Sequence, residues 1–458
     1  MMRNLFKDNK LAWFAVIFIL TKIGLWFYLF PAFQTPDEPA HFGYVQFIAE
    51  RNRLVDPAKD TKLSREVAKS LPILVFYVQF NPKVKINYST HDYYNKRNFI
   101  KALNNSSART DFSYDGFTAS AHPPLYYALS ALVYKLFFKS DLLVRIYAIR
   151  FFSAILSMLT LYIIYLSARI LFKDNFTSLI VTLAVALQPM YSMISVSINP
   201  DNLMYFFFAS FLYLSLVAIN ARELNHKNNL LMAFIIVLSF LTKEYAVILL
   251  FMYGLVLFFL FLRKRSSVGL AKKALISAIS LAAITVVSGW RFARTITASK
   301  LTVLEYFKTQ GFKYARVLDD YWGNFGWVDT PVDPHKFHDI YLAFLFLLVF
   351  GAAYAFLKER NKTEKDLIAF MLLTFLFSTA LLVFVDYTIA YDINHNHIQG
   401  RYFLITLPIN TFLPVIGLIH LAKKKYGALF AYQYFFLSLV FNILCVYSYI
   451  MPRYHVLH

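Results

Sequence analysis

The sequence FPAFQTPDEPAHFGYVQFIAE fills residues 30–50 and begins where an apolar run at residues 11–30 ends. Two adjacent acids, Asp37 and Glu38, stand at that boundary, and His41 follows one helical turn later. An apolar run of this length predicts a membrane-spanning helix, so the three side chains are expected at the rim of the bilayer. Acids at a membrane rim, followed by a long polar stretch, favour chemistry on a lipid-borne substrate over a transport path, which buries its ionisable groups near the bilayer centre.

The composition indicates an integral membrane protein. Hydrophobic residues make up 59% of the 458 residues, and the mean hydropathy is +0.51. The net charge of +20 comes from lysines and arginines that cluster at the ends of apolar runs. This placement favours orientation signals and contact with anionic lipids, and it argues against a nucleic-acid partner. The single Cys445 excludes an intrachain disulfide.

The apolar runs predict an all-α integral membrane bundle of about 11 transmembrane helices. These runs lie at residues 11–30, 146–168, 177–197, 203–220, 229–242, 245–262, 274–289, 339–357, 367–386, 402–421 and 427–450. Another apolar segment, 123–139, begins with two prolines and carries two lysines. Its length of about 16 residues suits a helix lying in the membrane interface. Two long connections, 31–145 and 290–338, are therefore expected to be extracytoplasmic loops, the first containing interfacial helices.

The distribution of basic residues sets the expected orientation. Lysine and arginine are frequent in alternate loops, as at residues 263–265 and 423–425, and scarcer in most of the others. The positive-inside rule then places the N-terminus in the cytoplasm and nearly every polar motif on the opposite side. In a bacterium this predicts a multi-pass protein of the inner or plasma membrane whose active site faces the periplasm or the exterior.

The first motif has a catalytic and a structural interpretation. At helical spacing Asp37, Glu38 and His41 share a face, where a carboxylate could take a proton from an acceptor hydroxyl. A carboxylate–histidine cluster could also hold a divalent metal ion, although this spacing is a weak signal for one. As a structural alternative, Thr35 caps a helix and Glu38 closes a capping box. Residues 42–50 then continue as an amphipathic helix along the membrane surface.

Other polar residues at span ends are candidates for substrate binding. Lys243 could hold a phosphate or pair with Glu244, and Arg401 beside Tyr402 could bind phosphate in a fork geometry or extend to lipid headgroups. Asp201 could act in the site or cap the helix that follows. His122 is either a substrate ligand or a polar residue ahead of a proline turn.

Aromatic residues gather in the predicted loop at 290–338. The segment YWGNFGW at residues 321–327 contains Trp322 and Trp327 together with two glycines. This composition is more typical of a lid or a substrate platform than of a solvated linker.

Five motifs in this order resemble a known family. They are PDExxHFxYxQ at residues 36–46, HPPLYY at 122–127, NPD at 199–201, WGxFGW at 322–327 and QGRYF at 399–403. The chain resembles, over about residues 30–410, a bacterial multi-pass membrane family long listed as a domain of unknown function. That family is grouped with the GT-C glycosyltransferases.

The resemblance implies a sugar donor carried on a polyprenyl phosphate and an acceptor glycan, lipid or protein of the cell envelope. It implies that Asp37 is the catalytic base, with Glu38 beside it in the acidic motif, and that Asp201 lies where related enzymes hold a second acid. His122 departs from the lysine often found before this proline turn in aminoarabinose-type relatives. The expected organisation is a catalytic module at residues 1–338 followed by transmembrane helices at 339–458. A cofactor is not identified, and a divalent metal ion stays an open possibility.

The predicted function is therefore a membrane glycosyltransferase that depends on a polyprenyl-phosphate sugar. The alternatives are a transporter or flippase for lipid-linked sugars, and a ligase or polymerase that moves a whole glycan. A structural membrane protein fits least well, because acids, histidines and tryptophans concentrate on one side. The span interiors are almost free of charge, which favours the enzyme over the transporter.

Overall fold

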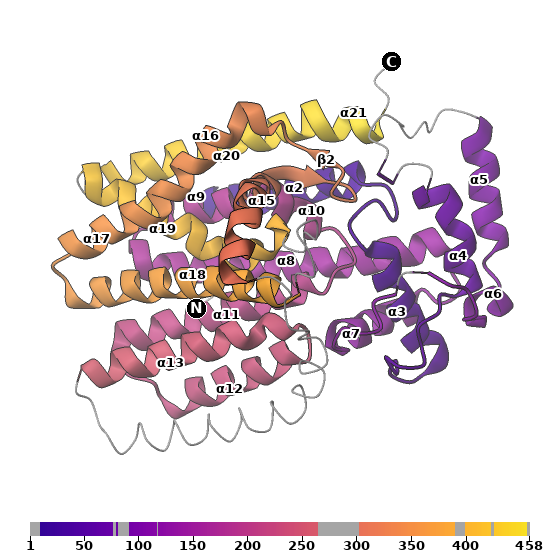
Figure 1. Ribbon diagram of the computed structural model, residues 1–458, viewed down its shortest axis with the longest axis horizontal. Helices are drawn as coiled ribbons and strands as arrows, with labels where there is room; N and C mark the ends of the chain where they lie inside the picture. Colours follow the sequence, from indigo (N-terminus) through magenta and orange to yellow (C-terminus); the bar gives the residue numbers. More distant parts are fainter. Residues whose placement is uncertain are drawn as a thin grey trace.

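The computed structural model describes residues 10–76, 79–80, 91–116, 118–263, 302–389, 399–422 and 426–455. The described chain is a helical bundle whose longer helices run roughly along the long axis of the molecule (Figure 1). A two-stranded antiparallel hairpin, β1 (Asn324–Phe325) and β2 (Thr330–Pro331), interrupts the helices. The expected all-α class is confirmed.

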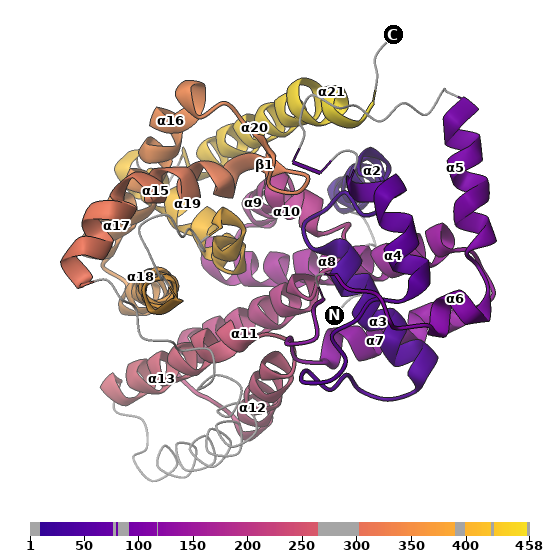
Figure 2. The same ribbon diagram turned by 45° about the vertical axis from the view of Figure 1, so that its right-hand side comes forward.

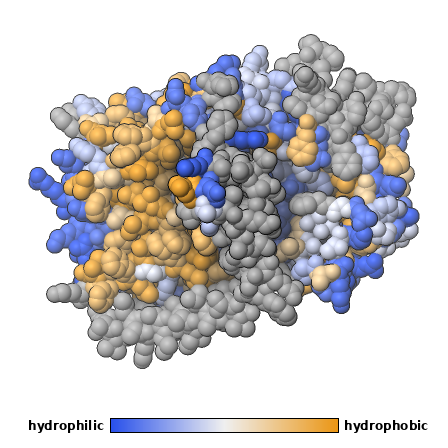
Figure 3. Space-filling view, in the orientation of Figure 1, coloured by the Kyte–Doolittle hydropathy of each residue, from blue (hydrophilic) through white to orange (hydrophobic). Residues whose placement is uncertain are grey.

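Seven helical segments in the described part are long and apolar enough to cross a membrane. They contain α8 (Leu142–Phe172), α11 (Asp201–Ala221), α13 (Val247–Leu262), α16 (Pro334–Phe346) with η3 (Leu347–Gly351) and α17 (Ala352–Lys358), α18 (Lys362–Ile389), η4 (Gly400–Thr406) with α19 (Leu407–Ala422), and α20 (Gly427–Cys445) with η6 (Val446–Ile450) and α21 (Met451–Tyr454). An apolar band covers the surface between two more polar ends (Figure 3). The protein is therefore a multi-pass membrane protein.

Shorter apolar helices complete the bundle. They are the segment Trp13–Leu29 of α2 (Lys10–Leu29), α9 (Asn175–Ala186) and α12 (His226–Phe240). Every expected span except 274–289, which lies outside the described residues, coincides with helix. The span expected at 177–197 is broken, because α9 ends at Ala186 and a short α10 (Pro189–Ile194) follows. Gln188 caps α10 through its side chain and also donates to the Tyr321 carbonyl at 2.5 Å.

The segment expected to lie in the interface is α7 (Leu125–Leu136), a helix of 12 residues. At 1.5 Å per residue it is about 18 Å long, too short to cross the hydrocarbon core. One face, which includes Tyr127 and Tyr134, is buried, whereas Leu132 and Leu136 on the other face are 61% and 81% exposed. This division between a buried and an exposed apolar face is typical of an interfacial helix.

Helices of the first long connection gather at one end of the bundle, here called the α3 end (Figure 2). They are α3 (Glu38–Arg51), α4 (Arg65–Leu71) with η1 (Pro72–Phe76), α5 (His91–Ala102), α6 (Ser106–Thr110) and α7. The prediction that residues 42–50 lie on the membrane surface is wrong. Phe42 and Val45 are fully buried, and Phe42 packs against Phe33 and Tyr134, because α4, α6 and α7 cover α3.

The segment expected to be a loop at 290–338 is largely structured where the chain is described. It contains the 21-residue helix α15 (Val303–Gly323), which starts with a capping box between Thr302 and Glu305, and then the β1–β2 hairpin. Helix α15 contains many charged residues, so this segment does not resemble a membrane span. Its amphipathic pattern was therefore not recognised, and a loop was predicted instead.

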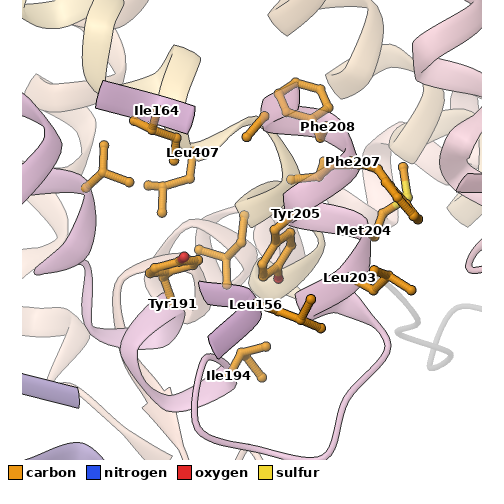
Figure 4. Packing of buried hydrophobic residues seen from close by; sticks show 14 of the residues in the cluster. Leu156, Ile164, Tyr191, Ile194, Leu203, Met204, Tyr205, Phe207, Phe208 and Leu407 are labelled. Carbon is orange, nitrogen blue, oxygen red and sulfur yellow. The ribbon is translucent and has the colours of Figure 1, made fainter. Parts of the chain in front are cut away.

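Buried aromatic and aliphatic side chains of α8, α10 and α11 form a core next to the α3 end. Tyr191, Tyr205, Leu156 and Ile194 approach one another there (Figure 4). Helix α20 is joined to the N-terminal half of the bundle, since Asn442 accepts from Trp26 of α2 at 3.3 Å and donates to the Leu187 carbonyl at the end of α9 at 2.6 Å. The division of the chain at residue 338 stays a prediction.

Two glycines allow helix α19 to approach η3 closely. A Cβ built on Gly417 would meet the Gly351 backbone at 2.9 Å. Because backbone atoms cannot turn aside as a flexible side chain can, the two segments pack at this distance only without a side chain on Gly417. Helix α19 follows η4, so this contact also holds the segment that carries Arg401.

Replacing Gly417 with valine is expected to separate α19 from η3. Overpacking of this kind costs about 1–3 kcal/mol, which lowers the melting temperature of the purified protein in detergent. Gly24→Val is the matched control, since no atom lies within 4 Å of a Cβ on Gly24. Equal melting temperatures for the two variants would contradict the close packing.

Candidate functional site

Six of the residues selected from the sequence meet at the α3 end, although they come from segments far apart in the chain. Ion pairs, ring contacts or electrostatic interactions connect Asp37, His41, His122, Asp201, Lys243 and Arg401. The residues come from the loop before α3, the first turn of α3, the turn before α7, the start of α11, the turn after α12 and the start of η4. This cluster is called the polar site below.

Asp37 precedes the first residue of α3 with its backbone in the left-handed conformation, at φ 61°. This conformation is uncommon outside glycine, and aspartate is one of the residues that tolerate it. The Asp37 side chain forms no capping bond, is 30% exposed, and accepts from Arg401 Nη2 at 2.7 Å. The structural alternative, a capping box formed by Thr35 and Glu38, is therefore wrong, because α3 starts at Glu38, three residues after Thr35, and Glu38 has another partner.

Glu38 forms a fully buried ion pair with Arg150 of α8. Arg150 Nε donates to Glu38 Oε1 at 2.7 Å, and Nη2 donates to Oε2 at 2.5 Å. The same guanidinium donates to the carbonyls of Phe30 and Pro31 at 2.6 and 2.8 Å. Asp37 and His41 interact as expected from their spacing, whereas Glu38 does not share their face. Glu38 instead fixes the loop that presents Asp37.

The Glu38 carboxylate also holds the loop that precedes the second acid. Glu38 Oε1 accepts from the Ile198 N–H at 3.1 Å. One residue later, the Asn199 N–H donates to the Tyr126 hydroxyl at 3.1 Å. Asp201 begins α11 directly after this loop, so the Glu38–Arg150 pair positions both Asp37 and Asp201.

Asp201 is paired rather than used as a cap. Lys243 Nζ lies 3.0 Å from Asp201 Oδ1, and the Tyr245 hydroxyl donates to the same oxygen. Pro200 occupies the cap position of α11 and forms no side-chain capping bond. Lys243 therefore pairs with Asp201 of a different helix and not with its neighbour Glu244.

Arg401 is buried, and within the described residues only part of its guanidinium forms hydrogen bonds. Its Nη2 binds Asp37, but Nε and Nη1 lack a hydrogen-bond partner among the described residues. Its guanidinium lies 5.6 Å from the centre of the Tyr402 ring. Gly400 sets this position, because a Cβ there would lie 2.1 Å from the Tyr321 backbone nitrogen of α15. The glycine of the QGRYF motif is thus required for close approach of the two segments.

Both histidines of the polar site are neutral at neutral pH. Burial, together with the neighbouring His122, lowers the pKa of His41 to about 3, and burial together with Lys243 lowers the pKa of His122 to about 4. His41 Nδ1 lies 2.9 Å from the Tyr127 hydroxyl, and the two histidine rings are 5.8 Å apart. They offer hydrogen bonds to a ligand rather than charge.

Asp37 is ionised over the whole physiological range. Burial raises the pKa of this carboxyl, but the Arg401 guanidinium, with Lys243, outweighs burial and holds the pKa below its usual value. A partly exposed carboxylate beside an arginine with unused donors can accept a proton from a hydroxyl while the arginine binds an anion.

The two tryptophans lie away from the ion pairs. Trp322 packs against Tyr341, Phe344 and Phe441, inside a cluster between α15, α16 and α20, so the structure does not bring it to the polar site. Trp327 Nε1 donates to the Phe33 carbonyl at 3.1 Å and so braces the loop before Asp37. Arg291 and Arg294, two further basic residues of the connection at 290–338, lie outside the described residues.

Arg150 is the main residue that the sequence analysis missed. It lies within an apolar run that was counted only as a span. A charged residue inside a membrane helix is expensive without a partner, and this signal could have linked it to one of the two acids at the end of the first span.

Glu38→Gln is expected to destabilise the protein by about 3–5 kcal/mol, because it leaves the Arg150 charge buried without its counter-ion. Thermal melting of the purified protein in detergent measures the loss. Asp115→Asn makes the same chemical change at an exposed pair with Lys62, where the acid is 91% exposed, and should leave the melting temperature unchanged. A Glu38→Gln protein as stable as the control would refute the structural role.

Comparison with solved structures finds an oligosaccharyltransferase of Archaeoglobus fulgidus. The form tethered to an acceptor peptide is 13% identical with a TM-score of 0.47, and covers 95% of this chain and 55% of that one. The form with zinc and sulfate is 14% identical with a TM-score of 0.44, covering 92% and 48%. The form with an inhibitory peptide and a dolichol-phosphate is 13% identical with a TM-score of 0.44, covering 94% and 56%.

The chain thus spans about half the length of these solved structures. A comparison with curated protein sequences gives no match. A family model described as "Predicted membrane protein (DUF2142)" matches residues 20–410, which is most of the chain and agrees with the extent of the five motifs. The protein belongs to the DUF2142 family of membrane proteins.

Proposed function

We propose that this protein is a GT-C type glycosyltransferase that moves a sugar from a polyprenyl-phosphate donor to an acceptor glycan, lipid or protein. One observation carries the proposal. A partly exposed carboxylate, Asp37, lies 2.7 Å from a buried arginine, Arg401, whose Nε and Nη1 have no hydrogen-bond partner in the described part of the chain. A base for the acceptor and an anion site for the leaving group are therefore adjacent.

The proposed reaction exchanges one bond at the anomeric carbon of the sugar. The acceptor oxygen forms a bond to this carbon as its proton passes to Asp37. The bond from the carbon to the phosphate oxygen breaks, and its electron pair stays on the phosphate. Arg401 Nε and Nη1, with Lys243 nearby, stabilise the charge that develops there. Attack opposite the leaving group gives inversion of the anomeric centre.

The other residues of the polar site have supporting roles in this proposal. Asp201 holds Lys243 in place, and Tyr402 packs beside the Arg401 guanidinium. His41 and His122, as neutral rings, bind sugar or acceptor hydroxyls. Glu38 acts as a positioning residue, since both of its oxygens bind Arg150.

The proposed location follows from the position of the polar site along the helices. Asp37, Asp201, Lys243 and Arg401 all lie at the ends of spans that the positive-inside rule directs away from the cytoplasm. In a bacterial inner membrane, the donor phosphate would then lie at the periplasmic or exterior rim, with its polyprenyl tail among the helices.

Asp37→Asn is expected to reduce transfer by about 10²–10⁴-fold, because the amide cannot accept the acceptor proton. Mass spectrometry of surface glycans from cells that carry only the variant measures the loss as one missing sugar unit. Asp115→Asn at the exposed Lys62 pair is the matched control. Wild-type glycans from folded Asp37→Asn protein would remove Asp37 from the role of base.

A transfer assay in detergent separates this proposal from a flippase. A glycosyltransferase forms its product without a sealed membrane, whereas a flippase only moves the lipid-linked sugar between leaflets. Purified protein that consumes a polyprenyl-phosphate sugar and releases polyprenyl phosphate supports the enzyme.

The pH dependence of kcat/KM should reflect the ion pair between Asp37 and Arg401. Because the pKa of Asp37 is held below its ordinary value, Asp37 stays a carboxylate from pH 8 down to below about pH 4 and causes no loss of activity there. In Arg401→Gln the lowering effect is removed, so the acid limb moves to higher pH. Arg222→Gln, at an exposed arginine that binds Thr363, is the control. An unmoved acid limb in Arg401→Gln would contradict the pairing.

A further inference from the structure

Each acid of the polar site already has a cation from within the chain. Asp37 Oδ2 is 2.7 Å from Arg401 Nη2, and Asp201 Oδ1 is 3.0 Å from Lys243 Nζ. The Tyr245 hydroxyl binds the same Asp201 oxygen. A divalent metal ion would need these carboxylate oxygens as ligands, and it would meet an arginine and a lysine next to them.

The residues therefore do not fit a resident metal ion. In the described part of the chain, no group of three or more His, Cys, Asp and Glu side chains is arranged to hold one. The His41 Nδ1 is engaged with the Tyr127 hydroxyl. A metal ion bound to the second oxygen of either carboxylate would lie close to the Arg401 or Lys243 charge, and repulsion between these like charges disfavours it.

The same two cations are suited to an anion. Arg401 is 7% exposed, and its Nε and Nη1 have no hydrogen-bond partner among the described residues. Each of these nitrogens can donate a charge-assisted hydrogen bond to a phosphate oxygen. Such a bond is stronger in a buried site than in water, because the effective dielectric constant is lower there.

We propose that the polar site binds the phosphate of its lipid donor without a divalent metal ion, through Arg401 assisted by Lys243. This inference rests on the proposed function, and it adds that the charge on the leaving phosphate is neutralised by side chains alone. The Asp37–Arg401 pair then serves two steps, since the arginine holds the phosphate while it keeps the carboxylate ionised and oriented.

Binding of undecaprenyl phosphate to the purified full-length protein in detergent tests this inference. Affinity is measured in EDTA and again with added Mg²⁺ or Mn²⁺. The expected result is the same affinity in both solutions. Arg401→Gln should weaken binding about tenfold or more in both, the range for a lost hydrogen bond to a charged group. Arg222→Gln is the matched control and should bind as the wild type does.

The outcomes that overturn the inference differ from those that overturn the proposed function. Binding that is lost in EDTA and restored by Mg²⁺ or Mn²⁺ overturns the metal-free site but leaves a glycosyltransferase in place. Metal-independent binding that Arg401→Gln does not weaken removes Arg401 as the phosphate ligand. Absence of binding in both solutions overturns the inference together with the polyprenyl-phosphate donor.

Discussion

The buried ion pair between Glu38 and Arg150 determines how the polar site is assembled. The arginine binds both oxygens of Glu38 and two carbonyls of the preceding loop, and Glu38 in turn accepts from Ile198. Two charges are buried at a real desolvation cost, which good geometry and additional hydrogen bonds offset. The result is a link between the loop before α3, helix α8 and the loop before α11, so one ion pair helps to position both Asp37 and Asp201.

Around this link the polar site uses its charges in pairs. Asp37 with Arg401 and Asp201 with Lys243 are each held by residues from different spans. Close packing of Gly400 on α15 and of Gly417 on η3 fixes the position of the segment that carries Arg401. Within the described ranges, these contacts leave the Arg401 Nε and Nη1 without hydrogen-bond partners next to a partly exposed carboxylate, which is the arrangement that the proposed transfer chemistry requires.

The sequence predicted the membrane class, the places of the spans and six of the residues that meet in the polar site, because apolar length and motif order carry that information. It did not predict which charged residues pair with one another. Glu38 was expected beside Asp37 and pairs with Arg150, and α3 was expected on the membrane surface and is buried. Pairing between residues 112 positions apart depends on tertiary packing, which periodicity does not encode. The helix within 302–338 was not predicted either, because α15 is amphipathic and charged and so does not resemble an apolar span.

The most direct test of the account is a cryo-electron microscopy structure of the full-length protein in lipid nanodiscs with undecaprenyl phosphate bound. The phosphate is expected within about 3 Å of Arg401 Nε or Nη1, with the Asp37 carboxylate facing the side from which an acceptor would approach. A phosphate bound away from Arg401, for example at the opposite end of the bundle near Lys173 and His420, would contradict it.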